Sequence, residues 1–242
     1  MSTFFGAPTL RLPKISAAFG SLMAQDCILC ATLASGRLVC DACARSMPHL
    51  AHACEICAIP LAGTGICGEC LRRAPAFDTA LAAFEYRFPL DRLIQRFKYA
   101  GDLAVGRWLA LELARRAAAA ERPALLVAPP LTPQRLRERG FNQAVVTAKI
   151  VGAHLGIRHS PDAFSKARDT APQPGLGRRA RLANLRAAFR CDVRLEGEHV
   201  AIVDDVLTTG ATAETLARAL KAAGAARVST WAIARTPDPR GR

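Results

Sequence analysis

Beyond residue 76, the hydrophobic positions of the chain switch repeatedly between strand spacing and helix spacing. Four stretches have strand-like patterns, one alternating and three short and apolar: residues 79–88, 124–128, 199–206 and 227–234. Four others carry apolar side chains at helical spacing: residues 90–97, 105–120, 141–155 and 213–223. Strands that alternate with helices predict an α/β fold, a parallel sheet with flanking helices, whose ligands bind at the carboxyl ends of the strands.

The first part of the chain has a different composition. Of the nine cysteines, all but Cys191 lie between residues 27 and 70, which predicts a small cysteine-rich module at residues 1–76 ahead of an α/β domain at residues 77–242. Residues 15–23 carry apolar side chains at helical spacing, and we expect a docking helix there. No stretch reaches the about 20 apolar residues that a membrane helix needs, so we expect no transmembrane segment. Charged residues interrupt the N-terminal apolar run, which argues against a signal peptide and favours a cytoplasmic protein.

The clustered cysteines form four Cys-x-x-Cys pairs at nearly even intervals: Cys27/Cys30, Cys40/Cys43, Cys54/Cys57 and Cys67/Cys70. Two thiolates separated by two residues bind one metal ion from a tight turn, and two such turns complete a tetrahedral site. The pattern therefore predicts two structural Zn²⁺ sites with four cysteine ligands each. Consecutive pairs or a cross-braced arrangement both satisfy it, and an iron–sulfur cluster is a further alternative. Disulfides are disfavoured because nothing in the sequence indicates secretion.

The chain is strongly basic, with a formal net charge of +13 and a sequence pI of about 10.0. Basic residues are densest between residues 130 and 190, where twelve arginines and lysines face three acidic residues. Such a surface attracts polyanions, and guanidinium groups bind phosphate in a bidentate manner. The alternative is an ordinary solvated surface. The charge thus favours a phosphorylated ligand or nucleic acid.

The most informative stretch is residues 201–212, which read Ala-Ile-Val-Asp-Asp-Val-Leu-Thr-Thr-Gly-Ala-Thr. A phosphate fits the amide groups at a helix N-terminus together with threonine hydroxyls, and Gly210 permits a positive φ or a close backbone approach. The carboxylates of Asp204 and Asp205 suit two ribose hydroxyls. The alternative is that the threonines merely cap the helix, but capping does not require two adjacent acids after a buried strand. The segment therefore predicts a ribose-phosphate site.

This segment resembles the phosphoribosyl pyrophosphate signature of type I phosphoribosyltransferases, which consists of a hydrophobic strand, two acids and a threonine- and glycine-rich loop. The resemblance implies a type I phosphoribosyltransferase-like sheet, preceded here by a zinc-ribbon module. It implies that Asp204 and Asp205 bind the ribose hydroxyls and that residues 208–212 bind the 5′-phosphate. The whole implied donor-binding segment is Asp204, Asp205, Val206, Leu207, Thr208, Thr209, Gly210, Ala211 and Thr212.

Further stretches resemble the ComF competence-protein family: residues 97–102, residues 135–143 with their Gly-Phe-Asn-Gln run, Arg168-Asp169-Thr170 with Gln173, and Arg181 with Asn184 and Phe189. A module of several Cys-x-x-Cys pairs ahead of a phosphoribosyltransferase domain is that family's layout. The resemblance implies phosphoribosyl pyrophosphate and Mg²⁺ as ligands. It also implies a link to DNA uptake, with single-stranded DNA or a competence helicase as partner.

If the chain transfers a phosphoribosyl group, it must position the donor and stabilise the charge that develops on the sugar and on the departing pyrophosphate. Asp204, Asp205 and Arg168 are then the expected catalytic residues. The candidate pyrophosphate contacts are the backbone after Pro130 and the side chains of Lys98, Arg135, Arg137 and Arg139. Residues 169–177, rich in proline and glycine, resemble the loop that covers the site in these transferases.

A second hypothesis is a non-catalytic protein that senses phosphoribosyl pyrophosphate or contacts single-stranded DNA. The positive charge and the zinc ribbons suit nucleic acid. Against DNA binding, aromatic residues make up only 6% of the chain, so base-stacking platforms are few. The acceptor of a transfer reaction is not encoded in any pattern of the sequence, because the segment after the last strand is short and polar.

Overall fold

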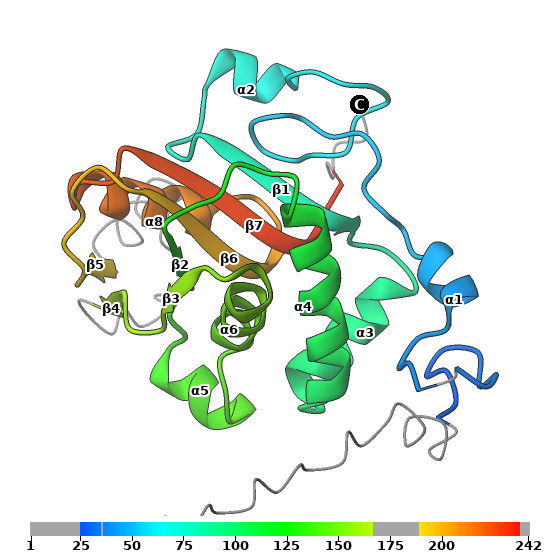
Figure 1. The fold of residues 1–242 in the computed structure, drawn as a ribbon. Coiled ribbons are helices and arrows are strands. Elements are labelled where there is room, and N and C mark those ends of the chain that lie inside the picture. The colour runs from blue at the N-terminus through cyan, green and yellow to red at the C-terminus, as the bar shows by residue number, and fades with distance from the viewer. Residues whose placement is uncertain (1–24, 35, 167–188, 238–242) are drawn as a thin grey trace, which may run out of the picture. The chain divides into compact units, whose positions relative to one another are not determined.

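The computed structural model describes residues 25–34, 36–166 and 189–237, and Figure 1 shows its fold. The chain divides into two compact units, Met1–Ser46 and Met47–Arg242, each of which is described by itself. The boundary expected after residue 76 stays a prediction. The expected docking helix at residues 15–23, the candidate Arg168 and the expected loop at residues 169–177 lie outside the described residues.

The second unit is built on a five-stranded sheet with the order β1-β7-β6-β2-β3, in which every pairing is parallel. Its strands are β1 (Thr79–Glu85), β2 (Leu125–Val127), β3 (Arg158–Ser160), β6 (His199–Leu207) and β7 (Arg227–Arg235). A short antiparallel pair, β4 (Phe164–Lys166) with β5 (Phe189–Cys191), lies outside this sheet. The predicted parallel α/β fold is therefore confirmed. The short strand β3 was not predicted, because its residues Arg158–Ser160 are polar and carry no hydrophobic signal.

Helices cover both faces of the sheet, as Figure 1 shows. On one face lie α3 (Leu90–Tyr99), α4 (Leu103–Ala117) and α6 (Gln143–Leu155), with α4 against β1 and β7 and α6 against β2, β3 and β6. On the other face α8 (Ala211–Ala222) packs against β6 and β7. The remaining helices are α5 (Pro133–Arg139), α2 (Gly68–Arg72) and, in the first unit, α1 (Asp41–Arg45).

The predicted helices occur, with shifted ends that have local causes. The helix expected at residues 141–155 begins at Gln143 because Asn142 is its N-cap and accepts from two helical N–H groups. The helix expected to begin at residue 213 begins at Ala211, directly after Gly210 in the left-handed region. The strand expected at residues 199–206 extends to Leu207, because its pairing with β7 continues to that residue.

The side of the sheet on which the chain adds its next strand changes between β2 and β6, although the two strands are parallel. From β2 the chain passes through α6 to β3 on one side, and from β6 it passes through α8 to β7 on the other. The adjacent strands β2 and β6 therefore form a topological switch point. Open α/β sheets bind ligands at the carboxyl ends of the strands at such a point. The fold thus brings the residues after Val127 beside Asp204 and Asp205.

Candidate functional site

The two adjacent acids, Asp204 and Asp205, lie near the carboxyl end of β6, which ends at Leu207. Successive side chains of a strand face opposite sides of the sheet, so the two carboxylates serve different neighbours. Asp205 is buried and faces the side of α3, where the Lys98 ammonium lies 2.8 Å from its Oδ1. Both partners of this ion pair are largely enclosed, so each compensates the charge of the other.

Asp204 is only partly exposed, and its Oδ1 accepts a hydrogen bond of 2.8 Å from the backbone N–H of Asp205. Burial, followed by the negative charge of Asp205, raises the pKa of Asp204 from 3.8 to about 7, against smaller opposing effects of that hydrogen bond and of Lys98. Near neutral pH this carboxyl is therefore divided between its protonated and ionised forms. A cation that binds there would favour the ionised form.

The loop after β6 has the geometry of an anion site. Thr208, Thr209 and Thr212 are exposed around the start of α8, and Gly210 precedes the helix with φ +76°. A residue with a Cβ is strained at that φ, which explains why a glycine occupies this position. The first amides of a twelve-residue helix and the exposed hydroxyls, of which that of Thr209 accepts from the N–H of Ala211 at 3.3 Å, together suit a phosphate group.

The Gly-Phe-Asn-Gln run at residues 140–143 positions neighbouring segments of the site through hydrogen bonds of its two amide side chains. Asn142 caps α6, and its Nδ2 donates a hydrogen bond of 2.9 Å to the carbonyl of Pro129, in the loop that follows β2. Gln143 is 1% exposed and donates to the carbonyl of Lys98 at 3.3 Å. These two amides tie the β2 loop and the end of α3 to one helix N-terminus, which fixes where Lys98 approaches Asp205.

The three candidate arginines of α5 differ from one another. Arg139 is partly buried, donates to Gln143 Oε1 at 3.1 Å and lies 5.2 Å from the centre of the Tyr99 ring. Arg135 and Arg137 are exposed. The structure therefore brings Lys98, Asp204 and Asp205 together and joins Arg139 to them through Gln143. Arg135 and Arg137 have exposed side chains and remain candidate contacts for a ligand that approaches from solvent.

One residue that the sequence reasoning missed is Arg235, which ends β7 and is only 6% exposed. Its Nη1 donates to the carbonyl of Leu207 at 3.0 Å and also contacts the carbonyl of Thr208. Its Nε donates to the carbonyl of Cys57 at 3.0 Å. The available signal was an arginine directly after the apolar run of β7, a position where a buried charge must have strong acceptors.

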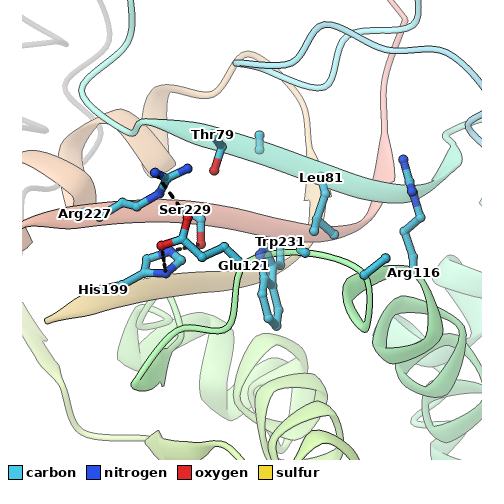
Figure 2. A pocket seen from close by; sticks show the side chains of 11 residues that line it. Thr79, Leu81, Arg116, Glu121, His199, Arg227, Ser229 and Trp231 are labelled. Atoms are coloured by element: carbon cyan, nitrogen blue, oxygen red, sulfur yellow. Dashed lines mark hydrogen bonds and ion pairs between the residues drawn. The ribbon is translucent and has the colours of Figure 1, made fainter.

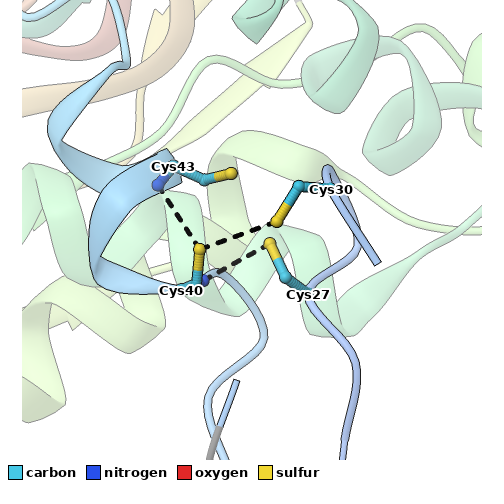
Figure 3. A group of neighbouring side chains, drawn as sticks. All are labelled: Cys27, Cys30, Cys40 and Cys43. Atoms are coloured by element: carbon cyan, nitrogen blue, oxygen red, sulfur yellow. Dashed lines mark hydrogen bonds between the residues drawn. The ribbon is translucent and has the colours of Figure 1, made fainter. Parts of the chain in front are cut away.

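The eight clustered cysteines form two groups, and in each group the sulfurs lie within 4.8 Å of one another. The groups follow the sequence: Cys27, Cys30, Cys40 and Cys43 in the first unit, shown in Figure 3, and Cys54, Cys57, Cys67 and Cys70 in the second. The structure thus has the consecutive arrangement and not the cross-braced one. Two compact four-thiol clusters are consistent with zinc.

The first cysteine of each cluster has a lowered pKa, whereas the pKa of Cys43, Cys57 and Cys70 is raised, by the hydrogen bond with Cys30 at Cys43 and by burial at the other two. Burial raises the pKa of Cys27, but hydrogen bonds from the backbone of Cys40, Leu29 and Cys30 outweigh it and lower the pKa to about 6. In the second cluster the same balance lowers the pKa of Cys54 to about 7. Thiolates are the metal-binding form of cysteine, so backbone N–H groups directed at sulfur favour the loaded state.

A separate pocket of about 250 Å³, with polar and apolar lining residues, opens at the opposite, amino-terminal edge of the sheet (Figure 2). There His199 Nε2 lies 3.0 Å from Ser229 Oγ, and Glu121 lies 3.6 Å from the other ring nitrogen and 3.2 Å from Arg227. Burial lowers the pKa of His199, so the ring is neutral at pH 7. The cluster joins the starts of β6 and β7 to the segment after α4, away from Asp204.

None of the helices in the described part of the chain combines the length and the apolar character that crossing a bilayer requires.

Comparison with known proteins identifies both parts of the chain. Residues 18–71 match the family model of the double zinc ribbon domain, and residues 179–242 match that of the phosphoribosyl transferase domain. Among solved structures, the glutamine phosphoribosylpyrophosphate amidotransferase from B. subtilis is 18% identical, with 58% of this chain and 30% of that chain covered and a TM-score of 0.41. That similarity is too low to carry an argument.

Two relatives have higher sequence identity to this chain than that solved structure has. The DNA utilization protein YhgH of Escherichia coli K12 is 35% identical over 170 residues, which cover 68% of this chain and 75% of that protein. The competence protein F of Haemophilus influenzae is 31% identical over 170 residues, which cover 66% of this chain and 74% of that protein. With a double zinc ribbon ahead of a phosphoribosyltransferase-like domain, the chain belongs to the ComF/YhgH family.

Proposed function

We propose that the carboxyl edge of the sheet binds phosphoribosyl pyrophosphate together with Mg²⁺. The observation that carries this proposal is the acid pair at the end of β6, followed at once by a glycine- and threonine-containing loop and a helix N-terminus. Asp204 and Asp205 accept from the ribose hydroxyls, and residues 208–212 bind the 5′-phosphate. The phosphoribosyl transferase family match supports the assignment.

Mg²⁺ fits the chemistry of this edge, because it prefers carboxylate and phosphate oxygens and usually retains several waters. The carboxyl of Asp204, with a pKa of about 7, supplies an ionised oxygen at neutral pH and above. When bound, the ion neutralises part of the negative charge of the pyrophosphate. The Lys98 ammonium, 2.8 Å from Oδ1 of Asp205, compensates the charge of that second carboxylate.

We infer that the reaction, if the donor is turned over, is phosphoribosyl transfer to an acceptor. The catalytic contribution is to position the donor and to stabilise the leaving pyrophosphate. Asp204 and Asp205 orient the ribose, while Lys98, Arg139, Arg135 and Arg137 with the backbone after Pro130 form the cationic side. Arg168 is assigned to the same charge-stabilising role.

A second candidate function is an accessory role in DNA handling, through single-stranded DNA or a helicase of competence. The specific support is the naming of the relatives, a DNA utilization protein and a competence protein. The exposed Arg135 and Arg137 supply a basic surface on α5. The two cysteine clusters, loaded with Zn²⁺, serve as structural modules in either function.

The donor proposal is tested by calorimetric titration of phosphoribosyl pyrophosphate with Mg²⁺ into zinc-loaded protein. We expect binding by the wild type and its loss in Asp204→Asn/Asp205→Asn. Asp162→Asn, which removes an exposed acid elsewhere, is the matched control and should bind as the wild type does. Absence of binding by the folded wild type would overturn the proposal.

The DNA proposal is tested by a salt series with a single-stranded oligonucleotide. Phosphate contacts release counterions, so the logarithm of affinity should fall linearly with the logarithm of salt concentration, with a slope reduced in Arg135→Ala/Arg137→Ala. No binding at low salt would remove direct DNA contact and leave a protein partner.

A further inference from the structure

The two cysteine clusters are copies of one local motif. Both have the spacing Cys-x2-Cys-x9-Cys-x2-Cys. In both, the third cysteine donates its N–H to the sulfur of the first, Cys40 to Cys27 at 3.4 Å and Cys67 to Cys54 at 3.3 Å. An alanine directly after the second cysteine has a positive φ in each copy, 56° at Ala31 and 55° at Ala58. The local geometry of the two metal sites is therefore the same.

The second copy differs in being built into the α/β core. Ala58 is 1% exposed and belongs to the hydrophobic cluster that includes Phe77, Ile202 and Leu216, on the α8 face of the sheet. The equivalent alanine of the first copy, Ala31, is exposed. Zinc at the second cluster thus fixes a turn that is part of the same packed core as α8, the helix behind the donor loop.

Arg235 connects this turn to the donor loop directly. Its Nε binds the carbonyl of Cys57, while its Nη1 binds the carbonyls of Leu207 and Thr208, where the loop begins. Hydrogen bonds from a charged donor are stronger than neutral ones, and a buried guanidinium has no water to substitute for a lost acceptor. A displaced Cys57 carbonyl therefore removes the Nε hydrogen bond and lets the guanidinium shift, and the Leu207 and Thr208 carbonyls that Nη1 holds shift with it.

We propose that Arg235 is a positioning residue of the donor site, and that it makes phosphate binding depend on Zn²⁺ at the second cluster and not at the first. The inference rests on the proposed donor function. Arg235 does not contact the donor; it holds the carbonyls of Leu207 and Thr208 so that the amides and hydroxyls of residues 208–212 face the phosphate.

The first test compares Arg235→Gln with Arg194→Gln, an exposed arginine that serves as the control. Ribose 5-phosphate and Mg²⁺-pyrophosphate are the two probes, because only the first needs the loop after β6. In Arg235→Gln with full zinc content, we expect the affinity for ribose 5-phosphate to fall by about tenfold or more, and that for pyrophosphate to stay unchanged. An equal fall for both probes would mean a general structural role and would overturn the proposal, as would no change for either.

The second test exploits the matched clusters through Cys67→Ser and Cys40→Ser, which remove equivalent ligands. We expect ribose 5-phosphate affinity to be lost in the first and retained in the second, with zinc content reduced by one ion in each. Equal effects of the two substitutions on affinity would overturn the proposal. If Cys67→Ser does not fold, Arg235→Lys, which leaves all ligands intact but cannot reach three carbonyls, must weaken binding instead.

Hydrogen exchange separates failure of this inference from failure of the donor function, because it needs no ligand. Amides of residues 208–212 should exchange faster in Arg235→Gln than in Arg194→Gln. If the wild type binds no donor while this difference is present, the donor proposal fails and Arg235 still positions the loop. If the wild type binds and exchange and affinity are both unchanged in Arg235→Gln, only the present inference fails.

Discussion

The Lys98 ammonium lies 2.8 Å from Asp205 Oδ1, and this ion pair joins the end of α3 to the end of β6. It connects residues far apart in the sequence, and the carbonyl of the same lysine accepts from Gln143. The pair leaves Asp204 as the carboxyl of the two that has no lysine of its own. Burial, followed by the negative charge of Asp205, raises the pKa of Asp204.

Removing the lysine should therefore act on both acids. In Lys98→Met we expect a loss of about 1–3 kcal/mol in the free energy of unfolding at pH 8, because the charge of Asp205 is left without its partner. Denaturant titration measures this, with the exposed Lys149→Met as control. The pH at which Asp204 takes up its proton should also rise, since Lys98 lowers the pKa of that carboxyl. Equal stability of the two variants would contradict the role of the pair.

Asp204 predicts a specific dependence of stability on pH. Its pKa is raised in the folded chain from 3.8 to about 7, so the folded state binds more protons than the unfolded state between these values. The contribution of this group is thus fully present below pH 3.8 and is lost as pH rises through 7. Asp204→Asn should remove this loss and raise the ligand-free stability at pH 8 by on the order of 1–3 kcal/mol. A variant less stable than wild type at pH 8 would refute the assignment.

The same carboxyl should control metal-dependent donor binding. Protons compete with Mg²⁺ for Asp204, so the affinity for the Mg²⁺ complex of phosphoribosyl pyrophosphate should weaken as pH falls below about 7. Isothermal calorimetry from pH 6 to pH 8, with ribose 5-phosphate without metal as the comparison, separates this effect from titration of the ligand. Parallel pH profiles with and without metal would contradict it.

Asn142 has two functions that substitutions can separate. Asn142→Asp retains an oxygen that caps α6 but loses the donor to the Pro129 carbonyl, whereas Asn142→Ala loses both. We expect the alanine variant to lose about 1–3 kcal/mol of stability and the aspartate variant less. Thermal unfolding checks the order. Equal losses would mean that the cap contributes nothing.

Gly210 should tolerate no side chain without strain. Its φ of +76° lies in the left-handed region, so Gly210→Ala should cost about 1–2 kcal/mol or shift the loop. Gly63→Ala is the control, because a Cβ there meets nothing within 4 Å. Donor affinity and unfolding free energy are the two measurements. A Gly210→Ala variant with wild-type values of both would show that the loop does not need this conformation.

Much of this protein is determined locally by its sequence. Hydrophobic periodicity specifies the parallel α/β fold, because it reports which side of each element is buried. The Cys-x-x-Cys spacing specifies two four-cysteine clusters, because two residues suffice to turn the backbone around one metal ion. The acid pair, Gly210 and the threonines mark the proposed donor site, because they are close together along one strand, loop and helix.

Other features were decided only by the tertiary structure. The pairing of Lys98 with Asp205 and the hydrogen bonds of Arg235 to the carbonyls of Cys57 and Leu207 join segments that are far apart along the chain. Which cysteine pairs share a cluster was open in the sequence, since both arrangements satisfy the same spacing. The Lys98 and Arg235 contacts share one physical reason. Long-range contacts depend on which buried charges and carbonyls the packed sheet brings within hydrogen-bond distance, and no periodicity within a segment carries that information.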